Sequence, residues 1–475
     1  MTYDAVVVGA GPNGLAAAIE LQRNGCQTLL IEAEETIGGA ARTEEVTLPG
    51  FLHDIGSAIH PLGVGSPFFS SLPLSSFGLE WVHPPVPLAH PLQDGPSAFL
   101  ERDLDVTASL LGADGPAWTR MFGPFVDQWS TFVDHVLRSP LSVPSAPMLM
   151  ARFASLALRS TPAIARAFRG EAARALLAGN AAHAGTPLTH RLTGAVGATL
   201  IVAAHSVGWP FPRGGAGSLT SALARYFESL GGTIETGRTI HSLAEIPSAR
   251  ATLLALTHRQ VASLQESGLQ ERFRARLARW HYGPGAFKLD WALDAAIPWR
   301  DPSVARAATV HVGGTLSEIT VSERAPLAGF VSERPFVLLA QPSLFDSSRA
   351  PAGKHTAWAY CHVPNGWSGD ATDAIEAQVE RFAPGFRERI LARSSWGTHR
   401  LEEWDTNLVG GDVNGGALTL AQTVGPSRWG LSRYVTPRRD LYLCSASSPP
   451  GGGVHGMAGY HAARAALTRS LGFGR

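Results

Sequence analysis

The feature that most constrains the fold is a glycine-rich turn between a short strand and a helix. Residues 3–8 form a β-branched strand, and Gly9-x-Gly11-x-x-Gly14 follows at once, leading into a segment of helical composition. A second strand is expected over residues 28–32, so the unit is about 30 residues long, the size of a nucleotide-binding βαβ unit. This context predicts a dinucleotide site, which three glycines alone would not.

Each residue type in this unit has a physical reason to be there. The first glycine allows the tight turn, the second lets the backbone approach a pyrophosphate, and the third lets helix and strand pack closely. The unpaired N–H groups of the helix N-terminus attract the pyrophosphate, and the predicted contacts come from Gly9, Gly11, Pro12, Asn13 and Gly14. Glu32, at the end of the second strand, can accept hydrogen bonds from both ribose hydroxyls and would repel a 2′-phosphate. The unit therefore predicts an adenine dinucleotide.

Two segments that follow this unit point to the type of dinucleotide. Ile37-Gly38-Gly39-Ala40-Ala41-Arg42-Thr43 resembles the Gly-Gly-x-x-Arg segment of FAD enzymes in the amine oxidase and phytoene desaturase superfamily. Phe51-x-His53-Asp54-x-Gly56-Ser57 resembles the segment that runs beneath the flavin in that superfamily. The resemblance implies FAD as the cofactor, with contacts from Gly39, Ala40, Ala41, Arg42, Gly56, Ser57 and Ala58.

The resemblance continues near the C-terminus. Residues 441–457 look like the second flavin motif of phytoene desaturase-like oxidoreductases, which implies contacts from Ala446, Ser447, Gly453, Val454 and His455. One departure is present, because Ser445-Ala446-Ser447 stands where the family commonly has Gly-x-Gly or Gly-Asp-Ala. A serine there either replaces a backbone approach with a hydroxyl contact or loosens the site.

The rest of the chain suggests how the domains are arranged. A helix over 219–230 and a strand over 233–240 resume the α/β rhythm, and the resemblance places Thr239 and Ile240 beside adenine. The pattern is helical from about 100 to 200, and a helix is expected over 454–471. Strand-like stretches suggest a mixed sheet, namely 283–294, 308–321 and 356–363.

The predicted fold class is α/β, with a Rossmann-type FAD-binding domain of the glutathione reductase-like ββα type and an inserted α+β substrate domain. The FAD-binding domain is expected to be discontinuous, over 1–75, 205–285 and 425–475. The substrate domain is expected over 76–204 and 286–424.

Composition excludes some functions and draws attention to one residue. Basic and acidic residues balance at 39 each, which argues against a nucleic-acid partner, and 45% of residues are hydrophobic. Only Lys288 and Lys354 are lysines, so the other 37 basic residues are arginine. A lysine that persists in such a chain is a candidate for a role that a guanidinium, which never deprotonates, cannot perform.

Three residues are candidates for catalysis. Lys288 lies in a segment that resembles the substrate-domain strand of flavin amine oxidases, where a lysine holds a water at flavin N5. A buried neutral amine can orient water or accept a proton, and a solvated strand lysine is the alternative. His455, expected in the first turn of the C-terminal helix, and His60 can exchange protons near neutral pH. No metal site is predicted, because the sequence contains no H-E-x-x-H helix or C-x-x-C pair.

The predicted function is that of an FAD-dependent oxidoreductase, phytoene desaturase-like, acting on a small apolar substrate. Desaturation, saturation and double-bond isomerisation all stay open, as does the electron acceptor. The alternatives are a flavin amine oxidase-like enzyme and a catalytically inactive FAD-binding protein. A cytoplasmic location is expected, contact of the basic helix at 271–279 with a membrane surface is a minor alternative, and the oligomeric state is left open.

Overall fold

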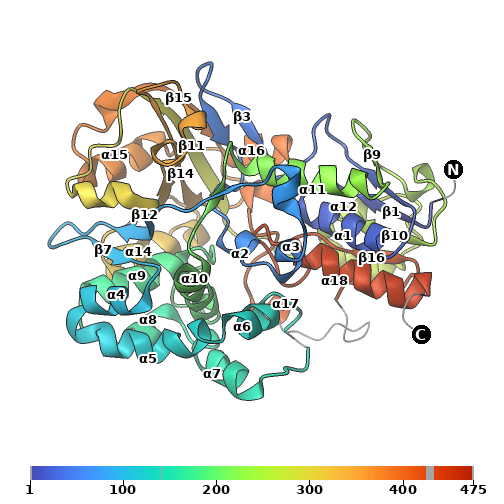
Figure 1. Ribbon diagram of the computed structural model, residues 1–475, viewed down its shortest axis with the longest axis horizontal. Coiled ribbons are helices and arrows are strands. Elements are labelled where there is room, and N and C mark those ends of the chain that lie inside the picture. The colour runs from blue at the N-terminus through green and yellow to red at the C-terminus, as the bar shows by residue number, and fades with distance from the viewer. Residues whose placement is uncertain (1–2, 141, 424–432, 473–475) are drawn as a thin grey trace.

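The computed structural model describes residues 3–140, 142–423 and 433–472. A five-stranded parallel sheet forms one side of the molecule (Figure 1), in the order β16 (Leu441–Leu443), β10 (Ala251–Leu254), β1 (Ala5–Val8), β2 (Thr28–Ile31) and β9 (Thr233–Glu235). All four residues of β1 are buried, as expected for a strand covered on both faces. The predicted parallel Rossmann sheet is confirmed.

Helices cover both faces of this sheet. One face packs against α1 (Pro12–Arg23), α11 (Ala216–Ser229) and α18 (Met457–Ala466), which share a core of leucine and alanine side chains. The other face packs against α12 (His258–Ser263) and α13 (Glu271–Ala278). Gly459 permits the tight contact of α18 with α1, because a Cβ there would lie 1.8 Å from the carbonyl oxygen of Asn13.

A seven-stranded mixed sheet forms the core of the other half. Its order is β15 (Ile390–Trp396), β11 (Gly285–Leu293), β14 (His355–Val363), β13 (Val337–Ala340), β12 (Ala307–Val312), β6 (Val86–His90) and β7 (Ala98–Leu100). All neighbouring pairs are antiparallel except β12 and β6. The predicted α/β class with an additional mixed sheet is therefore confirmed.

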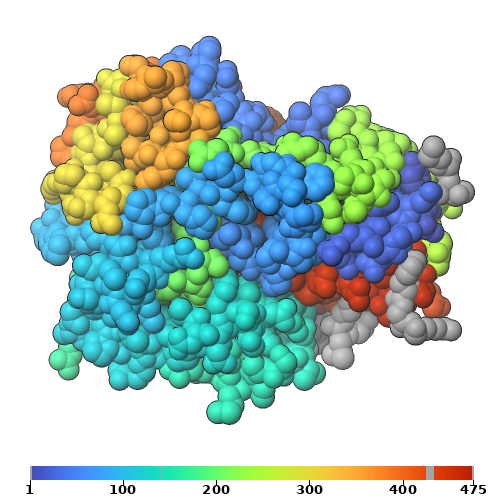
Figure 2. All heavy atoms as spheres, in the orientation of Figure 1, coloured from blue at the N-terminus to red at the C-terminus, as the bar shows by residue number. Residues whose placement is uncertain are grey.

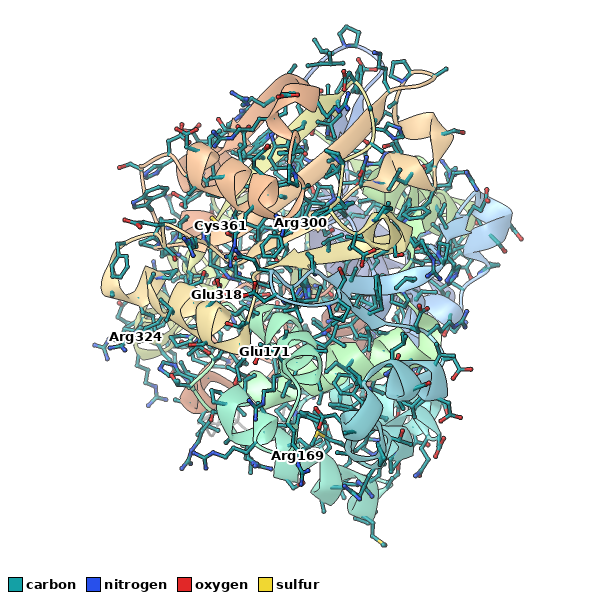
Figure 3. All side chains as sticks on the ribbon, turned by 90° about the vertical axis from the view of Figure 1, so that its left-hand side faces the viewer. Arg169, Glu171, Arg300, Glu318, Arg324 and Cys361 are labelled. Carbon is teal, nitrogen blue, oxygen red and sulfur yellow. The ribbon has the colours of Figure 1, made fainter. Side chains whose placement is uncertain are left out.

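Helices flank the mixed sheet. α14 (Leu316–Arg324) and α15 (Thr372–Phe382) pack against it. The predicted helical region contains α4 (Leu104–Leu110), α5 (Gly115–Val126), α6 (Trp129–Val136), α7 (Pro147–Ala157), α8 (Thr161–Ala165), α9 (Glu171–Ala182) and α10 (Thr193–Val207). Figure 3 shows Glu171 and Glu318 near the junction of α9 with α14, where the Glu171 carboxylate accepts the Leu316 N–H at 2.7 Å.

Short elements connect these parts. They are β3 (Thr43–Glu45) with β4 (Leu52–Asp54), β5 (Trp81–Val82) with β8 (Phe211–Pro212), α2 (Pro61–Val64), α3 (Pro67–Ser70), α16 (Thr398–Trp404) and α17 (Leu420–Thr423). In Figure 2 the segment around residues 60–80 lies across the centre, between the two halves. The proposed domain boundaries stay predictions, and those at 424 and 425 lie outside the described residues.

Three sequence-based element predictions were wrong in extent. The strand expected over 308–321 ends at Val312, and α14 begins at Leu316 because Thr315 and Glu318 form a capping box. The strand expected over 233–240 ends at Glu235, so Thr239 and Ile240 lie outside it. The last helix begins at Met457 and not at residue 454. None of the described helices has an apolar stretch of the length that a bilayer-spanning helix needs.

Candidate functional site

The turn after β1 has the geometry that the glycine motif predicts. Gly9 has φ +98°, a conformation that favours glycine. A Cβ on Gly14 would lie 1.8 Å from the carbonyl oxygen of Gly9, so α1 can approach the turn only with glycine there. Gly11 differs from both, since its φ is −72° and a Cβ would come no closer than 3.8 Å to any described atom outside its immediate neighbours. Close approach of a ligand would explain the glycine at position 11.

The groups at this turn suit a phosphate and a ribose. No described side chain caps the N-terminus of α1, so its first N–H groups remain available for an anion. The Asn13 Oδ1 atom is buried without a hydrogen-bond partner among the described residues. Glu32 is held at the end of β2, where its carboxylate accepts the N–H groups of Ala10 at 2.6 Å and Glu34 at 3.1 Å. A carboxylate has about four acceptor positions, so two ribose hydroxyls could still bind.

The second predicted flavin segment packs directly onto this turn. A Cβ on Gly39 would lie 3.2 Å from Gly11 Cα, which places the two loops side by side. The Ser57 N–H donates to the Ala40 carbonyl at 2.9 Å, and a Cβ on Gly56 would lie 2.1 Å from the same oxygen. The structure thus brings the 9–14, 39–42 and 56–58 segments together, and Ala41 and Ala58 are buried within them.

The Arg42 side chain makes its hydrogen bonds with backbone carbonyls of the protein. Its Nε donates to the Gly39 carbonyl at 3.1 Å, and an Nη atom donates to the Trp404 carbonyl at 2.7 Å. The guanidinium also lies over the Trp404 ring, 4.1 Å from its centre. Arg42 therefore braces the loop, and its contact with a phosphate stays a prediction.

The predicted position of Thr239 and Ile240 beside adenine has weaker support in the structure. The Arg238 N–H donates to the Glu32 carbonyl at 2.9 Å, so the chain just before Thr239 does run beside the residue that is expected to bind ribose. Thr239 is exposed, however, and Ile240 packs into the core below the sheet. The sequence had suggested that both residues lie in a strand, but the strand ends before them, at Glu235.

The C-terminal turn packs against the residues that follow the predicted flavin floor, where the Ser66 hydroxyl donates to the His455 carbonyl at 2.7 Å. The Ser447 hydroxyl donates to the Gly415 carbonyl at 2.7 Å, and a Cβ on Gly415 would lie 2.8 Å from the Ala446 carbonyl carbon. The departure from the family's glycines thus supplies a hydroxyl that ties this turn to the 414–416 loop. Gly453 and Val454 have positive φ values of +130° and +52°, which explains why the helix cannot begin at residue 454.

His455 precedes α18 and does not lie in its first turn. Its Nδ1 accepts the Met457 N–H at 3.1 Å, and burial lowers its pKa to about 4, so the ring is neutral with its proton on Nε2. That Nε2 is buried and makes no hydrogen bond of normal geometry with the described residues, although the nearby Gly451 and Gly452 carbonyls favour the protonated ring. His455 is therefore placed to donate a hydrogen bond to a ligand, which fits the negatively charged edge of a reduced flavin.

His60 lies two residues after Ala58, directly before α2. Its Nε2 is 3.0 Å from the Ser57 hydroxyl, and burial lowers its pKa to about 4. Its Nδ1 is buried with no partner among the described residues. These unpaired buried groups and the close approaches that only glycine permits fit a bound dinucleotide.

Lys288 is buried in β11 and pairs with an acidic neighbour that sequence analysis did not consider. Its ammonium group contacts Asp290 Oδ2, and the other oxygen of Asp290 is 3.5 Å from His53 Nδ1. Burial lowers the pKa of Lys288, and Asp290 opposes that shift. Burial raises the pKa of Asp290, but Lys288 and His53 more than offset it, so the pKa falls overall. The geometry indicates a charged pair where a free neutral amine was expected, whereas the other lysine, Lys354, is exposed.

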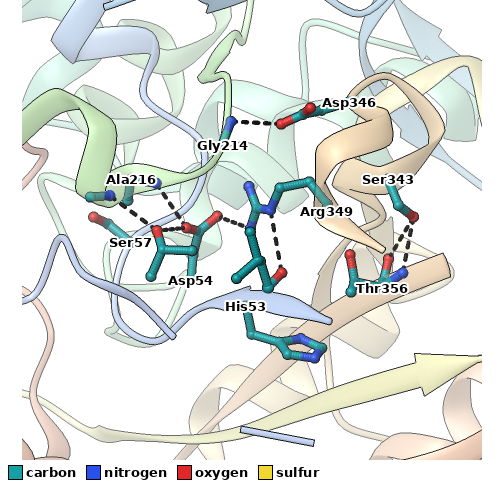
Figure 4. Close-up of polar contacts among 12 residues, drawn as sticks. His53, Asp54, Ser57, Gly214, Ala216, Ser343, Asp346, Arg349 and Thr356 are labelled. Atoms are coloured by element: carbon teal, nitrogen blue, oxygen red, sulfur yellow. Dashed lines mark hydrogen bonds and ion pairs between the residues drawn. The ribbon is translucent and has the colours of Figure 1, made fainter. Parts of the chain in front are cut away.

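A second buried ion pair joins the two halves (Figure 4). The Asp54 carboxylate accepts from Arg349 at 2.7 Å, from the Thr43 hydroxyl at 2.7 Å and from the Ala216 N–H at 2.8 Å. Asp346 accepts the Gly214 N–H at 2.7 Å beside it. These contacts fix the predicted flavin floor against the segment after β13, which sequence analysis could not place because Arg349 lies in no recognisable motif.

A cavity of about 640 Å³ opens beside the C-terminal turn. Its wall is mostly apolar and includes Met150, Phe153, Ala157, Val196 and Leu200 from α7 and α10. Ala446, Ser447, Gly453 and His455 line it on the side of the predicted flavin site. The cavity could therefore hold an apolar molecule in contact with the turn that is expected to bind flavin.

Two polar residues that line the cavity, Tyr360 and His183, were not predicted from the sequence. Tyr360 lies opposite Lys288 in the register of β14 and β11, and its ring stacks on Trp358 at 5.9 Å between ring centres. His183 Nε2 is 3.0 Å from His311 Nε2, and burial lowers the pKa of His183 to about 3. These residues come from distant helices and strands, so no local spacing signalled them.

The buried histidines predict a loss of stability in acid. Burial lowers the pKa values of His60, His90 and His455 to about 4, against about 6.5 in the unfolded chain. The unfolded state therefore binds more protons between these values, and the free energy of unfolding should fall as pH drops from 6.5 towards 4. Each histidine contributes up to about 1.4 kcal/mol per pH unit.

Urea titrations from pH 7 to 5 test this expectation. The free energy of unfolding should fall less steeply with falling pH in His90→Gln than in the wild type, whereas the control His399→Gln, at an exposed position, should match the wild type. Equal slopes in His90→Gln and the wild type would contradict the assignment.

Comparison with known sequences identifies a nucleotide-binding domain and a relative that aligns with almost the whole chain. A sequence model of the NAD(P)-binding Rossmann-like domain matches residues 7–70. The chain is 26% identical over 555 aligned residues to mouse (Mus musculus) pyridine nucleotide-disulfide oxidoreductase domain-containing protein 2, covering 97% of this chain and 92% of the relative.

Solved structures resemble the whole chain. An oxidoreductase from Methanosarcina mazei superposes with a TM-score of 0.64 at 16% identity, covering 98% of this chain and 99% of that one. Putrescine oxidase bound to putrescine superposes with a TM-score of 0.63 at 17% identity, covering 99% and 100%. The chain thus has a Rossmann-like nucleotide-binding domain at residues 7–70 and shares the overall fold of putrescine oxidase.

Proposed function

We propose that the protein is an FAD-dependent oxidoreductase, phytoene desaturase-like, that acts on an apolar substrate. The observation that carries this proposal is the apolar cavity of about 640 Å³ that opens on the 446–455 turn. Resemblance to oxidoreductases over nearly the whole chain supports it.

In this proposal the residues divide the work between binding and positioning. The Gly9–Gly14 turn and Glu32 hold the dinucleotide, and His455 donates from Nε2 to the flavin ring. The bound flavin would accept or donate a hydride at its N5 atom. The apolar walls of α7 and α10 hold the substrate and exclude water, which strengthens electrostatic interactions in the site. Desaturation, saturation and isomerisation are all compatible with this arrangement.

One observation favours a flavin amine oxidase-like enzyme as the second candidate. Trp358 and Tyr360 are parallel, with an interplanar angle of 7°, and Tyr360 both lines the cavity and lies beside Lys288. A cationic amine could rest against such rings. The charged Lys288–Asp290 pair weighs against this candidate, because it leaves no free neutral lysine to work as the resemblance implies.

The two candidates can be separated by mixing the FAD-loaded protein anaerobically with carotenoids, fatty acids and amines. We expect an apolar, uncharged compound to bleach the flavin absorbance. Bleaching by amines alone would favour the second candidate, and bound flavin that no compound reduces would favour an inactive FAD-binding protein.

A variant that fills the cavity sharpens this test. Val196→Trp places a large ring in the cavity wall and should slow flavin reduction at least about tenfold while leaving FAD content unchanged. Val321→Trp, at a site that is 65% exposed on α14, is the matched control and should have no effect. Equal reduction rates in both variants would remove the cavity from the proposal.

A further inference from the structure

One stretch of the helical region has an unusual charge pattern. Between residues 135 and 170 the sequence has five arginines, Arg138, Arg152, Arg159, Arg166 and Arg169, and neither Asp nor Glu. The whole chain has a formal net charge of zero, so this segment concentrates positive charge. Arg138 is neutralised by Asp134, whereas Arg152, Arg159, Arg166 and Arg169 are exposed.

The same stretch exposes large apolar side chains. Val143 and Met148 are 90% and 87% exposed, the highest values among the large hydrophobic residues described, and Leu158 is 52% exposed. Val143 precedes α7, Met148 lies in its first turn and Leu158 follows its end. We call Val143, Met148, Arg152, Leu158 and Arg159 together the α7 face.

The α7 face is continuous with the cavity. Met150, Phe153 and Ala157 project from the same helix into the cavity wall, and Leu158 both lines the cavity and is exposed. Figure 1 shows α7 at the lower edge of the molecule, away from both sheets, and Figure 2 shows this part protruding. Arg169 lies in the lower part of Figure 3 as well, so the positive charge extends along this edge.

We propose that the α7 face docks on the surface of an anionic lipid bilayer, beside the mouth of the cavity. Exposed apolar side chains next to arginines are the combination by which an amphipathic helix lies in the membrane interface. Anionic lipids complement the exposed Arg152 and Arg159 of the α7 face, whereas a second copy of this positively charged face would repel it. The docking does not depend on the reaction proposed above.

The basic helix singled out from the sequence is a weaker membrane contact. Residues 271–279, which contain α13, carry four arginines, but the large apolar residues Phe273 and Leu277 of this helix are each only 5% exposed. These side chains already pack beneath the parallel sheet, so α13 presents charge without an exposed apolar surface. The α7 face has both properties.

Vesicle co-sedimentation of the full-length, FAD-loaded protein tests the docking. We expect mixed phosphatidylserine–phosphatidylcholine vesicles (roughly one to three) to bind at least about tenfold more strongly than pure phosphatidylcholine, and more weakly as salt rises. Val143→Ser/Met148→Ser should lower binding about tenfold, because two exposed apolar side chains are removed. Arg152→Gln/Arg159→Gln should lower it on the order of twentyfold.

A matched pair of exposed apolar residues elsewhere provides the control. Leu327→Ser/Phe330→Ser changes side chains that are 62% and 56% exposed just after α14, and vesicle binding should stay at the wild-type level. FAD content and thermal unfolding should be unchanged in all three double variants. Failure of the wild type to sediment with anionic vesicles would overturn the proposal, as would an equal loss in the control. A dimer in sedimentation velocity that Val143→Ser/Met148→Ser dissociates would also overturn it, in favour of a second copy.

Discussion

Replacing Lys288 by methionine is expected to lower the free energy of unfolding by about 3–5 kcal/mol, because Asp290 would be left buried without its cation. Both side chains are almost completely buried, at 4% and 0% exposure, so water cannot compensate the carboxylate. His53 alone, 3.5 Å from Asp290, should only partly replace the lost charge. Urea unfolding of Lys288→Met measures the loss, and a change below about 1 kcal/mol would contradict a charged pair.

Loss of stability must be separated from loss of catalysis. Lys288→Met/Asp290→Leu removes both charges and should recover most of the stability, since apolar residues of similar volume often replace a buried ion pair at little cost. If Lys288 also moves or positions a proton, this stable variant should retain FAD but show flavin reduction slower by on the order of a hundredfold. Unchanged reduction in the double variant would leave Lys288 with a structural role alone.

The second large effect is expected at the glycine turn, where two neighbouring glycines should behave differently. Gly14→Ala should destabilise the protein by several kcal/mol and abolish FAD binding, because its Cβ would lie 1.8 Å from the Gly9 carbonyl oxygen. Gly11→Ala should leave the unfolding free energy of the FAD-free protein within about 0.5 kcal/mol of wild type, since no described atom beyond its neighbours lies within 3.8 Å of the added carbon.

FAD affinity should nevertheless fall at least about tenfold in Gly11→Ala, because the methyl group would occupy the space through which the pyrophosphate approaches. Thermal unfolding without FAD and fluorescence titration with FAD measure the two effects separately. Wild-type FAD affinity in a stable Gly11→Ala protein would contradict the placement of the dinucleotide.

The nucleotide half was predictable because its signals are local. The spacing of Gly9, Gly11 and Gly14 between a strand and a helix determines a turn that few other residues permit, and the structure has that turn. The 39–42 and 56–58 segments, identified by resemblance, do converge on it, whereas the 446–455 segment packs on residues 62–66, just beyond them. The predicted ends of helices and strands were wrong where a single residue has a backbone conformation that the local pattern does not show. Val454, with φ +52°, is such a residue before the last helix.

The substrate half was less predictable because its contacts are not local. Asp290 lies two residues from Lys288, and the side chains of a strand alternate, so the pairing of the two could have been inferred from spacing. Arg349, Tyr360 and His183 reach their partners from segments that carry no motif, and tertiary packing alone brings them there. The capping box of Thr315 with Glu318 was legible in the sequence and would have corrected the strand expected over 308–321.

The most direct test of the central claim is the flavin content of the purified wild-type protein. We expect a yellow protein that releases intact FAD on denaturation, close to one FAD per chain, or takes it up when FAD is added. A colourless protein that cannot be reconstituted with FAD would contradict the placement of FAD at this site, because the glycine turn, Glu32 and His455 would then hold something else.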